Sequence, residues 1–110
     1  MDSVLQPGAV IVAAPTKHGR FPVKKARTHI VMGLHGRLCV PTSAGQCRRK
    51  HLVPTSGNGL HRQVDLMTSF RTVITPTSRV KQIGQLSEAE LLLIRRITRL
   101  CWVDTLVPLL

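Results

Sequence analysis

The segment LSEAELLLIRRITRLCWV, residues 86–103, is the only long stretch of the chain with a clear helical period. Ser87 is followed three residues later by Glu90, which is the pattern of a capping box. In that motif the Ser87 hydroxyl accepts from the Glu90 amide, and the Glu90 carboxylate accepts from the Ser87 amide. Glu88 and Glu90 also lie at the positive end of the helix dipole. No glycine or proline interrupts the segment before Pro108, so we expect one capped helix here.

This helix is amphipathic and needs a partner surface. At 100° per residue one face is apolar and the opposite face is charged, with Trp102 at the boundary. A helix of this length is marginal in water by itself. The rest of the chain, a second copy, another protein or a membrane surface could cover it. We predict that the helix is an association element, through Leu93, Ile94, Ile97, Leu100 and Trp102.

The preceding 85 residues are divided into short segments by proline and glycine. Residues 9–14 resemble a buried strand that Pro15 ends, and residues 70–75 resemble a strand that Pro76 ends. The best hairpin candidate joins 29–32 to 37–40 through a glycine-containing turn. Residues 15–28, 41–64 and 78–85 are expected to be loop or linker.

This pattern predicts a small α+β fold, with short strands or a hairpin in the N-terminal two-thirds and one C-terminal helix. A largely disordered basic chain with one helix is the alternative. We divide the chain into a basic, proline- and glycine-punctuated region, 1–85, and an amphipathic helical segment, 86–110. At 110 residues it forms one domain at most.

The net charge of +11 is concentrated in the N-terminal part. Residues 1–64 contain ten lysines and arginines against one acid, and no acid occurs between Asp2 and Asp65. Such asymmetry indicates a polyanionic partner. The predicted nucleic-acid-binding residues are Lys17, Arg20, Lys24, Lys25, Arg27, Arg37, Arg48, Arg49, Lys50 and Arg62. Only two phenylalanines and one tryptophan are present, so base stacking on a ring platform is excluded and phosphate contacts remain.

Two further patterns carry weaker signals. Val-Pro-Thr-Ser occurs at 40–43 and again at 53–56, which we interpret as two similar turns without an assigned function. His35, Cys39, Cys47 and His51 are a possible tetrahedral zinc set. Their spacing lacks the tight knuckle of structural zinc sites, so no metal and no cofactor is expected.

An enzyme is not expected, because the five acids are few and no nucleophile–base–orienter set is visible. Three cysteines give no disulfide framework, which favours a reducing compartment. Neither a secretory signal nor a membrane-spanning segment is expected. We expect a cytoplasmic location, with the nucleus as the alternative because 48–51 resembles a short import signal.

The sequence therefore predicts a small, basic, non-enzymatic accessory or regulatory protein. Its composition suggests, as a hypothesis, a viral protein read from a frame that overlaps another gene. It would bind RNA or another polyanion through the basic region and form a homodimer, or bind a protein partner, through the helix. The alternative is a host-factor-binding or peripheral membrane-surface module, in which the helix binds the partner and the basic region only localises it.

Overall fold

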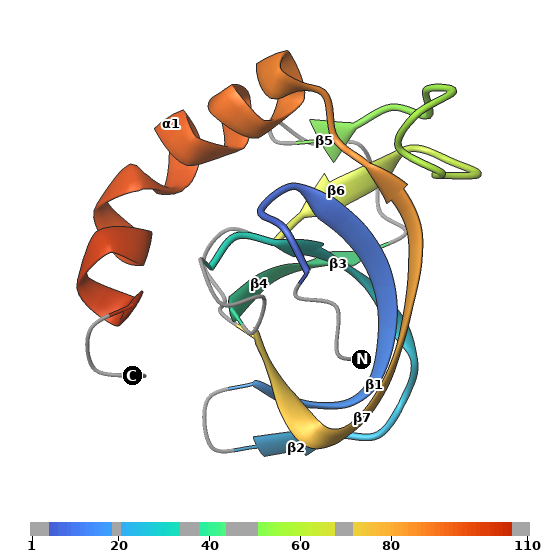
Figure 1. The fold of residues 1–110 in the computed structure, drawn as a ribbon, viewed down its shortest axis with the longest axis vertical. Helices are drawn as coiled ribbons and strands as arrows, with labels where there is room; N and C mark the ends of the chain where they lie inside the picture. The colour runs from blue at the N-terminus through green and yellow to red at the C-terminus, as the bar shows by residue number, and fades with distance from the viewer. Residues whose placement is uncertain (1–4, 19–20, 34–37, 44–50, 68–71, 107–110) are drawn as a thin grey trace.

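The computed structural model describes residues 5–18, 21–33, 38–43, 51–67 and 72–106, with side chains of 17, 18, 21, 22, 75–77 and 98–106 left undescribed. In these ranges the chain forms strands β1 to β7 and then helix α1 (Figure 1). The elements are β1 (Ala9–His18), β2 (Phe21–Val23), β3 (Arg27–Val31), β4 (Leu38–Ser43), β5 (His51–Leu52), β6 (Val64–Leu66), β7 (Thr72–Gln85) and α1 (Glu88–Leu106).

Four of these strands close on one another to form a small barrel. β1 pairs with β3, β3 with β4, β4 with β7, and β7 again with β1, all antiparallel. Figure 1 shows the resulting ring, with β7 curving along β1 over most of its length. β2 extends the sheet beside β1, and β6 followed by β5 extends it beside β4. Closure leaves these four strands without a free edge over the paired residues.

The predicted α+β class is wrong, because the fold is largely β with one C-terminal helix. The disordered alternative is also wrong, because the described residues form a paired sheet with a core. The hairpin was expected correctly, since Ile30 pairs with Val40 and Val31 with Cys39. Residues 78–85 are not a linker: they form the second half of β7.

Two prolines were expected to end strands, and neither does. Thr16 lies opposite Ile74, whereas Ala14 lies opposite Arg79, so Pro15 faces residues 75–78 across an irregularity in the pairing. The Ser78 hydroxyl donates a hydrogen bond to the Pro15 carbonyl there. A bulge tolerates proline because the regular ladder is interrupted at that point. Both β1 and β7 can therefore continue past their prolines.

Two hydrophobic clusters hold the sheet together. The first joins β1, β3, β4, β5, β6 and α1, and includes Val10, Ile30, Val40, Leu66 and Ile94. The second contains Ala9, Ile11, Ala13, Val31 and Cys39. Alternate residues of β1 belong to different clusters, as expected for a strand whose two faces are both buried.

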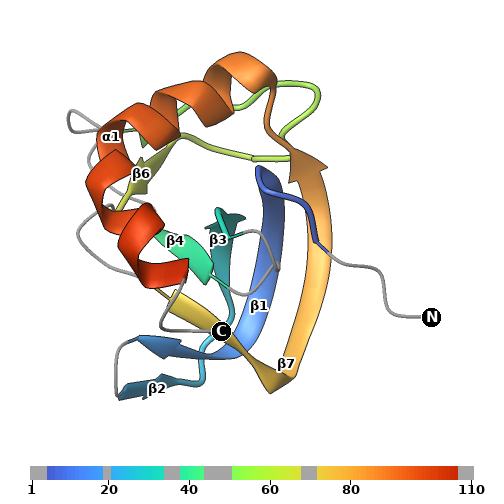
Figure 2. The same cartoon turned by 60° about the vertical axis from the view of Figure 1, so that its left-hand side comes forward.

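Helix α1 begins with the predicted capping box, which is confirmed. The Ser87 amide donates to Glu90 Oε1 at 2.9 Å, and the Glu90 amide donates to Ser87 Oγ at 3.2 Å. Figure 2 shows α1 lying along one side of the ring. Ile94 is fully buried in the first cluster, so the chain itself covers part of the helix.

Candidate functional site

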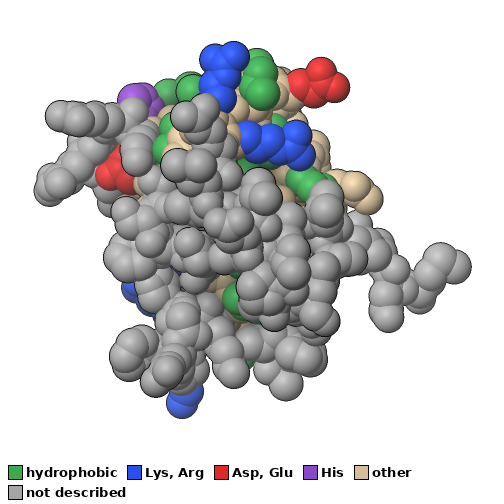
Figure 3. Space-filling view, turned by 90° about the vertical axis from the view of Figure 1, so that its left-hand side faces the viewer, with side chains coloured by type: hydrophobic (Ala, Val, Ile, Leu, Met, Phe, Trp, Pro, Cys, Tyr) green, Lys and Arg blue, Asp and Glu red, His purple; other side chains and the backbone are tan. Residues whose placement is uncertain are grey.

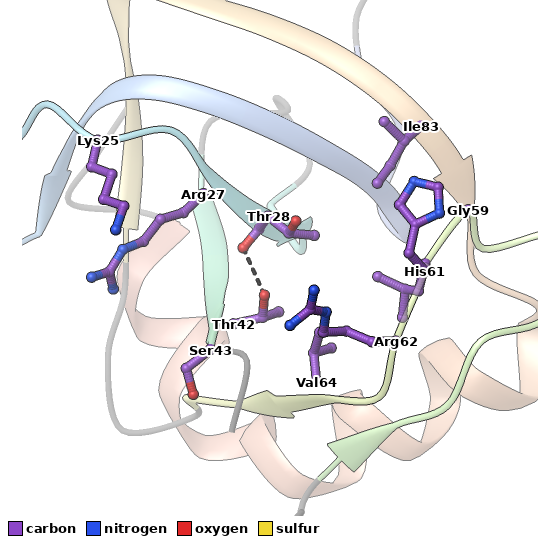
Figure 4. A pocket seen from close by; sticks show the side chains of 11 residues that line it. Lys25, Arg27, Thr28, Thr42, Ser43, Gly59, His61, Arg62, Val64 and Ile83 are labelled. Atoms are coloured by element: carbon purple, nitrogen blue, oxygen red, sulfur yellow. Dashed lines mark hydrogen bonds between the residues drawn. The ribbon is translucent and has the colours of Figure 1, made fainter. Parts of the chain in front are cut away.

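A pocket of about 420 Å³ collects several of the predicted basic side chains. Figure 4 shows Lys25 and Arg27 on one side and His61 and Arg62 on the other, with Thr28 and Thr42 between them. We call this hollow the cation pocket. It is lined by Lys25, Arg27, Thr28, Thr42, Ser43, Gly59, Leu60, His61, Arg62, Val64 and Ile83. Segments far apart in the sequence therefore form one basic, hydroxyl-lined hollow.

The floor of the cation pocket is a cross-strand pair of threonines. Ile30 pairs with Val40, which places Thr28 of β3 beside Thr42 of β4. Thr42 Oγ1 donates to the Thr28 carbonyl at 3.0 Å, and Thr42 is 5% exposed. The bond fixes the direction of the Thr42 proton, so the lone pairs of its oxygen can accept from a ligand.

Asn58 holds the loop that forms the opposite wall. Its side chain is fully buried. Its Oδ1 accepts from the amides of Thr55 and Leu60, both at 3.1 Å. Its Nδ2 donates to the Val53 carbonyl at 2.9 Å and to Glu90 Oε2 at 3.0 Å. One amide side chain thus fixes residues 53–60 and ties them to the first turn of α1.

The backbone of the same loop packs directly against the backbone of β7, which leaves no space for a side chain at Gly59 or Gly84. A Cβ on Gly59 would lie 2.0 Å from the Ile83 carbonyl oxygen, and Gly59 has a φ of +70°. A Cβ on Gly84 would lie 2.2 Å from the carbonyl carbon of Asn58. Glycine is needed at both positions because the backbones approach so closely. His61 and Arg62 directly follow this clamped segment, so its position sets where they enter the cation pocket.

The charged side chains described in the lining of the cation pocket are all positive. Lys25, Arg27 and Arg62 are exposed, and the described lining contains no aspartate or glutamate. Arg27 is also linked to the core, because His29 Nδ1 donates to the Arg27 carbonyl at 2.9 Å. His29 is 1% exposed, and its burial lowers the pKa of the imidazole below 6.5, with the positive charge of Arg27 acting in the same direction. A neutral His29 therefore supports the strand that carries Arg27.

The structure places some, but not all, of the ten predicted nucleic-acid-binding residues. Lys25, Arg27 and Arg62 line the cation pocket, and Lys24 is exposed next to it in sequence. Lys17 lies in β1, opposite Pro22 and Val73, and its side chain is not described. The others lie outside the described residues: Arg20, Arg37, Arg48, Arg49 and Lys50.

Of the predicted association residues, Ile94 is buried in the chain's own core, so it is not available to a partner in this structure. Leu93 is 48% exposed and Ile97 is partly exposed. Leu100 and Trp102 lie in α1, but their side chains are not described. Leu92, which was not predicted, is 52% exposed.

On the side of the molecule that carries α1, exposed hydrophobic, basic and acidic side chains lie next to one another (Figure 3). A groove of about 630 Å³ separates the start of the helix from residues 51–57. It is lined in part by Leu86, Glu90 and Leu93, together with Val53, which is 50% exposed. The surface around α1 is therefore mixed in character, unlike the cation pocket.

The possible zinc set is divided by the fold. Cys39 is buried in β4, and burial raises its thiol pKa to about 12, whereas His51 is exposed on β5. His51 lies opposite Asp65, and Asp65 lies opposite Ser43, which is four residues and roughly 13 Å along β4 from Cys39. His35 and Cys47 are outside the described residues. Within the described ranges, histidine, cysteine and acidic side chains form no group of three or more that could hold a metal.

Sequence reasoning missed Thr28, Thr42, Ser43 and His61 as pocket residues. The repeated Val-Pro-Thr-Ser was the available signal, and it was interpreted as two turns without function. Its first copy supplies Thr42 and Ser43 to the cation pocket. Its second copy supplies Thr55, whose Oγ1 accepts from the Asn58 amide at 3.1 Å.

Neither a known protein-family model nor a curated protein sequence matches this chain. No helix among the described residues is both long enough and apolar enough to cross a bilayer. The cellular location, the viral accessory role and the peripheral membrane contact stay predictions.

Proposed function

We propose that this protein binds RNA through the cation pocket. The observation that supports this most is that three positive side chains, Lys25, Arg27 and Arg62, line one hollow whose described lining contains no acid. Guanidinium groups form bidentate hydrogen bonds to phosphate, and the lysine ammonium adds a positive point charge. The chain contains only two phenylalanines and one tryptophan, and no tyrosine, which favours backbone contacts over base stacking.

Hydroxyl groups in the floor favour RNA over DNA. Because the Thr42 proton is directed at the Thr28 carbonyl, the Thr42 oxygen can accept from a ribose 2′-hydroxyl. Thr28 and Ser43 add two further hydroxyl groups to the lining. The 2′-hydroxyl is the group by which a protein distinguishes the two nucleic acids at a given site. We expect Thr42→Val to reduce the preference for RNA over DNA of the same sequence.

The proposal is tested by fluorescence anisotropy with labelled oligouridine at several salt concentrations. Arg27→Ala combined with Arg62→Ala should weaken binding and reduce the slope of log K against log salt by about 1.4, since each contact with a single strand contributes about 0.7. The control is Arg95→Ala, which removes one charge from an exposed position of α1 and is compared with Arg27→Ala and Arg62→Ala, each made singly. A loss in Arg95→Ala as large as in Arg27→Ala and Arg62→Ala would contradict the proposal.

A second candidate function is cleavage of the bound RNA, favoured by the presence of His61 among the cations. Imidazole is the most common general acid and base in enzymes, and guanidinium groups stabilise charge that develops on a phosphoryl group. A 2′-hydroxyl would lose its proton to His61 as its oxygen bonds to phosphorus. The 5′-oxygen would then leave, taking a proton from the imidazolium, and a cyclic 2′,3′-phosphate would remain.

End-labelled RNA incubated with the protein distinguishes cleavage from binding alone. Products with a cyclic phosphate that disappear in His61→Gln, with affinity retained, would support cleavage. Intact RNA under conditions of full binding would leave binding alone as the function.

We also propose that two copies associate through the exposed face of α1. Leu92 and Leu93 are about half exposed, and Glu88 and Arg96 lie four residues before and after Leu92. Antiparallel packing centred on Leu92 would place Glu88 of one copy near Arg96 of the other. This charge complementarity favours a second copy as the occupant of that face.

A further inference from the structure

A second depression lies on β1 and β7 and includes Ala26, which is between Lys25 and Arg27 of the cation pocket in sequence. Its volume is about 280 Å³. It is lined by five aliphatic and two basic residues: Val12, Ala13, Ala14, Ala26, Val80, Arg79 and Lys81. We call it the β7 site. None of its residues was predicted to bind a ligand, and the cation pocket does not use them.

The strand register connects the two depressions. Val12 lies opposite Lys81 on one side and opposite Thr28 on the other. Residues directly opposite one another in antiparallel strands present their side chains on the same face. Lys81, Val12 and Thr28 therefore form a row, and Thr28 in turn lies beside Thr42 in the cation pocket. Lys81 is two strands from Thr28, which is roughly 10 Å at about 4.8 Å per strand.

The residues between the depressions also connect them. Lys25, Arg27 and Thr28 line the cation pocket, whereas Ala26 lines the β7 site. Lys24, Lys25 and Ala26 are exposed, as are Arg79 and Lys81. The linings of both depressions contain no acid among the described residues. Positive side chains therefore line both depressions, with Lys25, Arg27 and Arg62 in the cation pocket and Arg79 and Lys81 in the β7 site.

We propose that the β7 site binds the nucleotide next to the one held in the cation pocket. In this proposal Arg79 and Lys81 contact its phosphate, and the aliphatic side chains of Val12, Ala14 and Ala26 contact the sugar and base. This inference rests on the proposed RNA binding and extends it from one phosphate to a run of single-stranded chain. Phosphate contacts of this kind position the strand without reading its sequence.

The experiment compares two ligands of different length with the full-length protein. The probes are the dinucleotide UpU, which is short enough for the cation pocket alone, and a longer labelled oligouridine. Arg79→Gln combined with Lys81→Gln should weaken binding of the long probe and reduce its salt slope by about 1.4. The same variant should leave the affinity for UpU unchanged. Glutamine keeps much of the side-chain stem, and circular dichroism checks that the fold is intact.

Arg95→Gln, which removes one exposed charge outside both depressions, is the control, and Arg79→Gln and Lys81→Gln made singly must each lose more affinity for the long probe than this control does. Equal losses in the three single variants, or an equal loss for UpU and the long probe in the β7-site double variant, would overturn the β7 site. A different result would refute the cation pocket itself: the β7-site variant loses affinity for the long probe, whereas Arg27→Ala combined with Arg62→Ala does not. The extension from the cation pocket to the β7 site would then fail as well. If the wild type binds neither probe, RNA binding itself is refuted.

Discussion

Replacing Asn58 with aspartate tests whether one buried amide holds the wall of the cation pocket to α1. The aspartate can still accept from the amides of Thr55 and Leu60, but it cannot donate to Val53 or Glu90. Two hydrogen bonds are lost, at about 0.5–1.5 kcal/mol for a neutral acceptor and about 1.5–3 kcal/mol for a carboxylate. The new carboxylate also lies where Nδ2 was, 3.0 Å from Glu90 Oε2. We expect a total loss of roughly 3–5 kcal/mol in the free energy of unfolding.

Thermal unfolding followed by circular dichroism measures this loss, which corresponds to a fall in Tm of roughly 10–20 °C for a chain of this size. Gln82→Glu makes the same amide-to-carboxylate change at an exposed position and is the control. The decisive comparison is the double variant with Glu90→Gln. Its glutamine amide can donate to the aspartate, so the double variant should be more stable than Asn58→Asp alone. Strictly additive losses would refute the direct contact between residues 58 and 90.

Three further outcomes follow from burial and charge. Ile94→Ala should destabilise the fold by about 2–5 kcal/mol in urea denaturation, because Ile94 is fully buried, whereas Val53→Ala, at a side chain that is 50% exposed, should change stability by less than about 0.5 kcal/mol. Because burial lowers the His29 pKa below 6.5, stability should be complete above that pH and fall as the pH drops through the lowered value. Tm should therefore fall between about pH 7.5 and about pH 5.5, and His29→Gln, whose amide can still donate to the Arg27 carbonyl, should reduce the fall; an unchanged pH dependence would contradict this assignment. Leu92→Glu combined with Leu93→Glu should convert a dimer to a monomer in light scattering, and an unchanged mass would refute association through this face.

The hairpin and the helix could be predicted because local chemistry determines them. The capping box identified the start of α1, and the two short segments 29–32 and 37–40, joined by a predicted glycine-containing turn, identified β3 and β4. The barrel could not be predicted in this way, since its closure depends on pairing β1 with β7, about seventy residues later. Pro15 and Pro76 then indicated strand ends, whereas the pairing irregularity between β1 and β7 accommodates both.

The orientation of α1 was predicted only in part, for a reason visible in its sequence. Residues 91–94 are four consecutive apolar residues, which together point in every direction around the helix. Pattern alone therefore could not decide which of them faces the core. Ile94 and the partly buried Leu91 pack against the first cluster, and Leu93 remains about half exposed.

The sequence predicted the basic residues of the candidate site but not its hydroxyl residues. Excess positive charge identified Lys25, Arg27 and Arg62 among ten candidates. Charge alone could not distinguish these three residues from the other seven. They come together because Asn58 binds Glu90 of α1 and Gly59 packs against the backbone of β7, which positions the loop before Arg62. Hydroxyl groups carry no charge signal, so Thr42 was not recognised as part of the site.

The most direct test of RNA binding in the cation pocket is an amide chemical-shift titration of the isotope-labelled full-length protein with oligouridine. We predict the largest shifts at Arg27, Thr28, Thr42 and Arg62, with the exposed face of α1 from Glu88 to Arg96 unchanged apart from Glu90, which contacts Asn58. Shifts confined to α1, with the amides of the cation pocket unmoved at saturating RNA, would contradict the account.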